Sequence, residues 1–244
     1  MLSLLYQDDY LVAIDKPPGL LVHRTGLDAG ETQFALQLLR DQLGRPVWPA
    51  HRLDKGTSGV LLFALDATTA SLIGQTFDVG DSVKKTYRAV VRGWPPAEGL
   101  IDHPLKRMPD DARAGREEVQ AAQTRYRTLA HYELPLPYGN FPTTRCALVE
   151  LQPLTGRRHQ LRRHMKHIAH PIIGDATHGK GPLNRAVAEF LGLQRLWLHA
   201  LRLELRHPVD STPLCIEAAP GSAWSGWQLH DTGECGASVS ATAN

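Results

Sequence analysis

The chain has 244 residues, of which 42% are hydrophobic and 21% charged, with a net charge of +2, as in an ordinary globular protein. No apolar run approaches the ~20 residues that span a bilayer, and the opening Met1–Asp9 is too short and too soon acidic for a signal peptide. The three cysteines form no CxxC pair, which favours free thiols in the cytoplasm and argues against a zinc ribbon or a disulfide framework.

In the first half of the chain, short β-branched runs predict strands, and apolar residues three or four apart predict helices. We expect strands at residues 2–6 and 10–14, a helix at 31–43, a fully buried strand at 60–65, a helix at 68–77 and a strand at 84–93. Gly44 follows the first of these helices as a stop signal.

In the second half, a polar stretch at 106–122 predicts a mobile loop. Strands are expected at 124–133, 145–151, 196–205 and 214–218, with a basic helix at 155–169 and a short helix at 185–191. Because strands and helices mix without regular βαβ alternation, we predict an α+β fold with a mixed, largely antiparallel sheet. Residues 1–229 are expected to form one domain, followed by a disordered Gly-, Ser- and Ala-containing tail at 230–244.

Asp54 stands at the entrance to the buried strand, directly before the turn Gly56-Thr57-Ser58-Gly59. Polar residues at the end of such a strand often face a cleft, so Asp54 is a candidate catalytic carboxylate. An aspartate before a turn can also simply accept hydrogen bonds from the turn's backbone amides. The residues of this stretch leave both interpretations open.

The expected basic helix carries five cations between Arg157 and Lys166 and no acidic residue. Leu161, Met165 and Ile168 form an apolar stripe that would anchor the helix to the sheet. Arg162 lies beside this stripe, where its side chain could reach a buried carboxylate.

Arg157 and Arg158 would occupy the first turn of that helix, where the macrodipole disfavours cations. Cationic side chains beside free N–H groups would suit a bound phosphate. The alternative is a merely solvated basic face, which is the commoner meaning of a run of charges.

Two rival chemistries have weaker support. His159, His164, His167 and His170 are close in sequence, but no cysteine or carboxylate stands among them, so we expect no metal site. Ser58 could serve a hydrolase with a histidine, yet its surroundings lack the pattern of a nucleophile elbow.

Three segments resemble the motifs of the RluA-type pseudouridine synthase family: His51–Gly59, Lys85-Thr86-Tyr87 and Thr155–His164. The opening, from Leu5 to His23, is also similar to the start of that family's catalytic domain, without a preceding S4 domain. The resemblance implies the pseudouridine synthase fold around a central cleft. It further implies that Asp54 is the nucleophile, that Tyr87 packs beside the target base and assists its deprotonation, and that Arg162 pairs with Asp54.

By the same resemblance, the chain would isomerise a uridine in structured RNA without metal or cofactor, after flipping the base out of its helix. Arg52 would fill the vacated stack, and His51, Arg157, Arg158 and Lys166 would contact the RNA. Attack at C1′ and a glycal route are both open.

Within the family, three segments resemble members that modify a T-stem uridine of tRNA, position 65 in tRNA numbering: Asp15-Lys16-Pro17, Phe141–Arg145 and Gly192–Leu196. Ribosomal RNA or another tRNA site is the alternative substrate, and a catalytically silent RNA-binding module is the alternative class. We expect a cytoplasmic monomer with no membrane partner.

Overall fold

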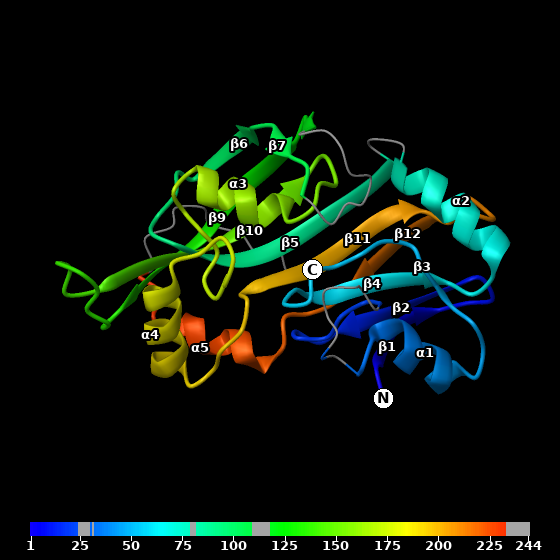
Figure 1. The fold of residues 1–244 in the computed structure, drawn as a ribbon, viewed down its shortest axis with the longest axis horizontal. Helices are drawn as coiled ribbons and strands as arrows, with labels where there is room; N and C mark the ends of the chain where they lie inside the picture. The colour runs from blue at the N-terminus through cyan, green and yellow to red at the C-terminus, as the bar shows by residue number, and fades with distance from the viewer. Residues whose placement is uncertain (24–29, 31, 79–81, 109–117, 233–244) are drawn as a thin grey trace, which may run out of the picture.

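A computed structural model describes residues 1–23, 30, 32–78, 82–108 and 118–232. Ten strands join in one sheet that crosses the whole molecule, in the order β1-β2-β4-β11-β5-β10-β9-β6, with β3 added beside β4 and β12 beside β11 (Figure 1). Their bounds are β1 Ser3–Gln7, β2 Leu11–Lys16, β3 Trp48–Pro49, β4 Ser58–Ala64, β5 Val83–Arg92, β6 Glu98–Asp102, β9 Gln123–Leu134, β10 Thr144–Pro153, β11 Leu198–Arg206 and β12 Pro213–Glu217.

The pairing of β4 with β11 is parallel, whereas every other pairing between the described strands is antiparallel. The predicted α+β class with a mixed, largely antiparallel sheet is therefore confirmed. All seven residues of β4 are buried, as the apolar run after Asp54 predicts.

The helices lie around the sheet, with α1 beside β1 and β2 and α3 over β9 and β10 (Figure 1). Their bounds are α1 Ala35–Leu43, α2 Ala67–Asp78, α3 Gln160–His167, α4 Gly181–Leu191 and α5 Ser225–Gln228, with a 3₁₀ turn at Ser222–Trp224. In the described part of the chain no helix is long and apolar enough to cross a membrane.

The prediction of a helix from residue 155 is wrong, because α3 begins only at Gln160. Arg157 and Arg158 consequently lie in the loop before the helix and not in its first turn. The side-chain amide of Gln160 bonds to the Thr155 hydroxyl and to the Arg157 backbone amide, which holds this segment in a non-helical path.

Two further helix boundaries differ from those that the sequence predicts. The structure begins α4 at Gly181, four residues before the predicted start, since Pro182 is favourable in a first helical turn. The first expected helix starts at Ala35, and Glu31 lies outside the described residues.

Two expected irregular regions contain paired backbone. At the two ends of the expected loop 106–122, strands β7 (Leu105–Lys106) and β8 (Val119–Gln120) pair, and residues 109–117 lie outside the described part. In the expected tail, Asp231 and Thr232 pair with β9, and residues 233–244 lie outside the described part.

Two buried clusters lie on either side of the middle of the sheet, where β4, β11 and β5 are neighbours. We call this region the joint. One buried cluster packs α1 against β2 and β4, and another packs Leu161 and Met165 of α3 against β5 and β10. Tyr87 of β5 contacts both clusters. Since the segment before β4 and the loop before α3 meet over this joint, the fold brings Asp54 and Arg162 to the same place.

Gly59 makes the parallel pairing at this joint possible. Its φ of +105° is a conformation that L side chains rarely adopt, and a Cβ there would lie 2.2 Å from the Ala200 carbonyl oxygen. Both the backbone angle and the close approach of β11 therefore require glycine.

Replacing Gly59 by alanine is expected to lower the free energy of unfolding by at least about 3 kcal/mol, because the clash involves backbone that cannot rotate away. Urea denaturation followed by circular dichroism measures this. The control is Gly74→Ala in α2, where no atom of the described residues outside the backbone of its own helix and its two chain neighbours lies within 4 Å of the added Cβ. There we expect a gain of about 0.5–1 kcal/mol. Similar unfolding midpoints for the two variants would contradict the role of Gly59.

Candidate active site

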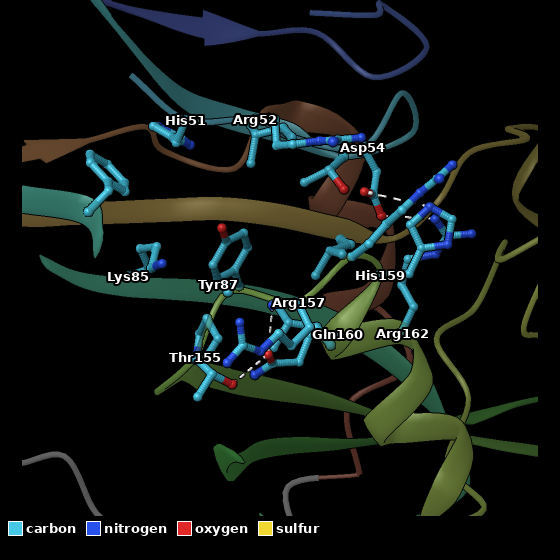
Figure 2. A pocket seen from close by; sticks show the side chains of 18 of the residues that line it. His51, Arg52, Asp54, Lys85, Tyr87, Thr155, Arg157, His159, Gln160 and Arg162 are labelled. Carbon is cyan, nitrogen blue, oxygen red and sulfur yellow. Dashed lines mark hydrogen bonds and ion pairs between the residues drawn. The ribbon is translucent and has the colours of Figure 1, made fainter. Parts of the chain in front are cut away.

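A pocket of about 460 Å³ lies above β5, between the segment that leads into β4 and the loop that leads into α3. Figure 2 shows Arg52 and Asp54 on one side, Thr155, Arg157 and Gln160 on the other, and Tyr87 between them. This volume is in the range of sites for small molecules or single nucleotides.

The two carboxylate oxygens of Asp54 have different surroundings. Oδ2 accepts a hydrogen bond of 2.8 Å from Nη1 of Arg162. Oδ1 lies 3.8 Å from Nε2 of His159 and accepts no hydrogen bond in the described part of the chain. The side chain is 25% exposed, so one oxygen is fixed while the other faces the pocket. The turn after Asp54 is closed by its backbone carbonyl, which accepts from the Thr57 amide, so the carboxylate is left for Arg162.

Arg162 is shared by two carboxylates. Its Nε and Nη2 donate to Asp175 at 2.7 and 2.8 Å, while Nη1 donates to Asp54. The side chain of Asp175 is fully buried, and its Oδ1 also accepts from the amides of Thr177 and His178. Burial alone would raise the pKa of Asp175, but the hydrogen bonds from Arg162 lower it overall. The guanidinium is thereby fixed in one orientation.

Sequence reasoning placed Arg162 beside the apolar stripe of α3 and predicted its pairing with Asp54, which the structure shows. It missed Asp175. The available signal was a carboxylate that directly follows the apolar run Ile172-Ile173 and Gly174, in a place where burial demands a cationic partner.

The loop before α3 is held by the buried amide of Gln160. Its Oε1 accepts from the Thr155 hydroxyl at 2.6 Å and the Arg157 amide at 3.0 Å. Its Nε2 donates to the Gln123 carbonyl and to the Thr124 hydroxyl of β9. One side chain thus fixes this wall of the pocket to the sheet.

Lys16 fixes the opposite wall. Its fully buried ammonium donates to the carbonyls of Pro17, Leu20 and Lys55, the last being the residue after Asp54. Burial lowers its pKa to about 7, although the nearby Asp54 carboxylate acts in the other direction. Sequence reasoning did not assign this lysine a role.

His159 and His178 form a pair beside Asp54. The Nδ1 of His159 and the Nε2 of His178 are 3.0 Å apart, within hydrogen-bond distance. Burial lowers the pKa of both rings, that of His178 to about 4. Near pH 7 the pair is therefore uncharged, and the ion pair of Asp54 among the described residues is the one with Arg162.

Tyr87 lies on the floor of the pocket, where β5 runs between β10 and β11. Burial and the nearby Asp54 carboxylate both raise the pKa of its hydroxyl above its usual value. The phenol consequently stays protonated at neutral pH. Its ring offers a flat apolar surface beside Asp54.

The other predicted residues are distributed around this pocket. Arg52, Arg157 and Arg158 line it, and Arg52 and Arg157 are exposed. His51 also lines it, but its ring stacks on Phe77 and its Nε2 accepts from the Leu62 amide. Lys166 lies on the exposed face of α3 and does not line the pocket.

The lining is strongly basic. Among the described residues it contains a single carboxylate, that of Asp54, and six basic side chains: Arg52, Lys85, Arg107, Arg157, Arg158 and Arg162. A pocket of this charge favours a polyanionic substrate such as a nucleic acid.

The rival hydrolase residue does not reach this pocket. The Ser58 hydroxyl is buried, 2.9 Å from Nδ1 of His199, and accepts from Arg195. The other nitrogen of His199 is bonded to the Ala218 carbonyl. This arrangement serves the joint between β4 and β11.

The four histidines considered for a metal site are held by contacts with other residues of the protein. Besides His159, His164 contacts Thr124 and the His103 carbonyl, His167 stacks on His103, and His170 bonds to the Arg92 carbonyl. No three His, Cys, Asp or Glu side chains are placed to hold a metal ion within the residues that the structure covers.

Comparison with known proteins agrees with this geometry. A family model described as RNA pseudouridylate synthase matches residues 10–167. The chain belongs to the RluA-type pseudouridine synthases. It is 50% identical over 230 residues to a protein of Vibrio cholerae named tRNA pseudouridine synthase C, covering 93% of this chain and 94% of that protein. A Pasteurella multocida protein of the same name is 49% identical over 227 residues, 91% of this chain and 93% of that one.

Solved structures of the family share the fold. Human RNA Pseudouridylate Synthase Domain Containing 4 superimposes with a TM-score of 0.69 at 30% identity, covering 93% of this chain and 92% of that one. Human RNA Pseudouridylate Synthase Domain Containing 1 gives a TM-score of 0.70 at 26% identity, with 90% and 84% covered. The predicted family, its fold and its class of enzyme, a pseudouridine synthase, are therefore confirmed.

Because Asp175 is buried and Asp54 is partly exposed, the two carboxylates should respond differently to the loss of Arg162. Arg162→Met is expected to lower the free energy of unfolding by about 3–5 kcal/mol, mainly by leaving the Asp175 charge unpaired. Adding Asp175→Asn should restore part of this loss, and adding Asp54→Asn should restore little. Urea denaturation of the single and double variants gives the comparison. Equal rescue by both second substitutions would show that burial does not distinguish the two partners.

The neutral, enclosed ring of His51 predicts a loss of stability in acid. Burial, with a smaller effect from Lys85, lowers its pKa from 6.5 to about 3. Below pH ~6.5 the imidazole is protonated in the unfolded chain but stays neutral in the folded protein. This lowers the free energy of unfolding by about 1.4 kcal/mol per pH unit. His51→Gln keeps an acceptor for the Leu62 amide and should make the decline between pH 6 and 4.5 shallower by that amount. Unfolding free energies at pH 8, 6 and 4.5 test this, and parallel curves for the two proteins would refute it.

Proposed function

We propose that this pseudouridine synthase isomerises a uridine of tRNA, with Asp54 as the nucleophile. The observation that carries the proposal is the asymmetry of the Asp54 carboxylate. Oδ2 is fixed by Arg162, and Oδ1 is free of hydrogen bonds from the described residues and faces a basic pocket. A carboxylate oriented in this way suits attack on an electron-poor sugar carbon, as in glycoside hydrolysis.

The reaction breaks the N1–C1′ glycosidic bond, turns the uracil and joins C5 to C1′; C5 loses a proton and N1 gains one, so substrate and product are isomers. In our proposal Oδ1 of Asp54 either attacks C1′, forming a bond that breaks again when C5 joins C1′, or begins a glycal route, while Arg162 holds the carboxylate in place. The detached uracil must stay in the pocket, and the Tyr87 ring provides a surface for it to pack on. Since its hydroxyl stays protonated, Tyr87 would act on the base through packing and hydrogen bonding.

The target base must leave its helix to reach Asp54, so we propose base flipping. Arg52 is exposed at the rim of the pocket, two residues before Asp54, where its guanidinium could fill the vacated stack. Arg157 and Arg158 at the opposite rim, and Lys166 beyond it, would contact phosphates. His51 would support the rim through its stacking on Phe77.

Transfer RNA is the proposed substrate because relatives that match nearly all of this chain are named tRNA pseudouridine synthase C. The resemblance to members that modify the T-stem supports uridine 65 as the target. Ribosomal RNA and other tRNA sites are the alternatives that the test below separates.

The test is tritium release from tRNA transcribed with 5-³H-uridine, comparing the wild type with Asp54→Asn. We expect release by the wild type and a loss of at least ~10³-fold in the variant, because a nucleophile cannot be replaced by an amide. Tm values of the two proteins control for folding. Mapping of the modified base by chemical modification and primer extension should then identify position 65. Release from ribosomal RNA alone would overturn the tRNA assignment, and release from neither RNA would leave a silent RNA-binding module.

A further inference from the structure

Lys85 is a cation in the pocket for which the proposed chemistry has no use. It stands two residues before Tyr87 on β5, so both side chains project from the same face of the sheet and line the pocket. Figure 2 shows Lys85 on the side of Tyr87 that faces away from Asp54. The ammonium lies 5.7 Å from the centre of the Phe77 ring.

Among the residues that the structure describes, no carboxylate pairs with the Lys85 ammonium. Its Nζ donates no hydrogen bond within the part of the chain that the structure covers, and the pocket's one carboxylate among these residues, Asp54, is held by Arg162. Burial lowers the pKa of Lys85, which shows that the ammonium is held at a cost in free energy. A bound anion would remove that cost.

Gly156 lies beside the Lys85 ammonium and carries a second possible donor, its backbone amide. A Cβ built on Gly156 would lie 3.8 Å from the Lys85 Nζ, and among the described residues, apart from Gly156 and its two chain neighbours, no other atom would lie within 4 Å of it. The Gly156 backbone amide forms no hydrogen bond with the described residues. The loop that carries it is held by Gln160, so the position of this amide is fixed before any ligand binds.

An ammonium next to a free glycine amide, in a loop without a side chain in the way, is a donor set suited to phosphate oxygens. We propose that Lys85 and the Gly156 amide bind a phosphate that flanks the flipped uridine, and so fix the nucleotide's backbone while Asp54 acts on its sugar. The inference rests on the proposed function, since it takes the phosphate from an RNA substrate.

A phosphate is charged before and after the reaction, which distinguishes it from the alternative partner, a carbonyl oxygen of the departing uracil. A contact with phosphate stabilises the bound substrate and the transition state equally, so its loss weakens binding and leaves the chemical step nearly unchanged. A contact with uracil strengthens as the base becomes anionic, so its loss would slow that step.

The experiment measures Kd for unmodified tRNA transcript by filter binding over a range of salt concentrations, in the Asp54→Asn background to prevent turnover. Lys85→Met keeps the length of the side chain and removes the charge. We expect a 3- to 10-fold rise in Kd near 0.1 M salt and a slope of log Kd against log salt that is smaller by about 1. In the presence of Asp54, the single-turnover rate at saturating tRNA should change less than 3-fold.

Lys84→Met is the matched control. Lys84 is the neighbouring residue on the same strand, its side chain is 56% exposed, and it pairs with Glu204 at 3.3 Å outside the pocket. The same change of charge there should leave Kd and the salt slope as in the parent protein. Lys85→Arg should keep the wild-type salt slope, because it retains the cation.

Gly156→Ala tests the same subsite without altering a charge. The protein has room for the methyl group, which would occupy the space beside Nζ, so we expect unchanged Tm and weaker tRNA binding.

Two results would overturn the proposal. One is Lys85→Met and Gly156→Ala variants that bind tRNA like the Lys84→Met control. The other is unchanged binding with a slowed single turnover, which would place Lys85 on the uracil. Absence of tritium release by the wild type refutes the proposed function and leaves these binding measurements readable.

Discussion

The candidate active site depends on one guanidinium that two carboxylates share. Arg162 is fixed by two hydrogen bonds to buried Asp175, and only its remaining nitrogen reaches Asp54. A guanidinium is planar and presents its donors in a rigid fork, so the Asp175 contacts determine the direction of the third donor. The Asp54 carboxylate is therefore positioned from a residue 121 positions later in the chain, through an arginine between them.

Each wall of the pocket is fixed by one buried side chain that forms hydrogen bonds to the backbone of neighbouring segments. Lys16 holds the turn after Asp54 through the Lys55 carbonyl, and Gln160 holds the loop before α3 to β9. Both walls stand on one sheet, and they meet where Gly59 allows β4 to run parallel against β11. The separation of the walls is thus set by backbone hydrogen bonding in the sheet and not by flexible surface contacts.

The sequence predicts the strands of this sheet well, because their β-branched and apolar runs are local signals. It predicts Asp54, Tyr87 and Arg162 through motifs that the structure gathers in one pocket. It fails where a contact depends on the assembled fold. The start of α3 is decided by what Gln160 bonds to, and the buried environment of Asp175 exists only once α3 packs on the sheet. The short strand β6 was missed because its residues carry a weak pattern, and its pairing with β9 stabilises it.

A pocket with six cations and one carboxylate poses a problem for that carboxylate, since a fully neutralised aspartate is a poor nucleophile. The shared arginine resolves it. The charge of Arg162 is already balanced by Asp175, so the group of Asp54, Arg162 and Asp175 retains one net negative charge. Arg162 can then orient Asp54 without cancelling its charge. The remaining cations lie around this group, where the phosphates of an RNA would supply anions that the described lining of the pocket does not contain. Because Arg162 orients Asp54 and the other cations face the RNA, one small pocket can attract a polyanion and keep a reactive carboxylate.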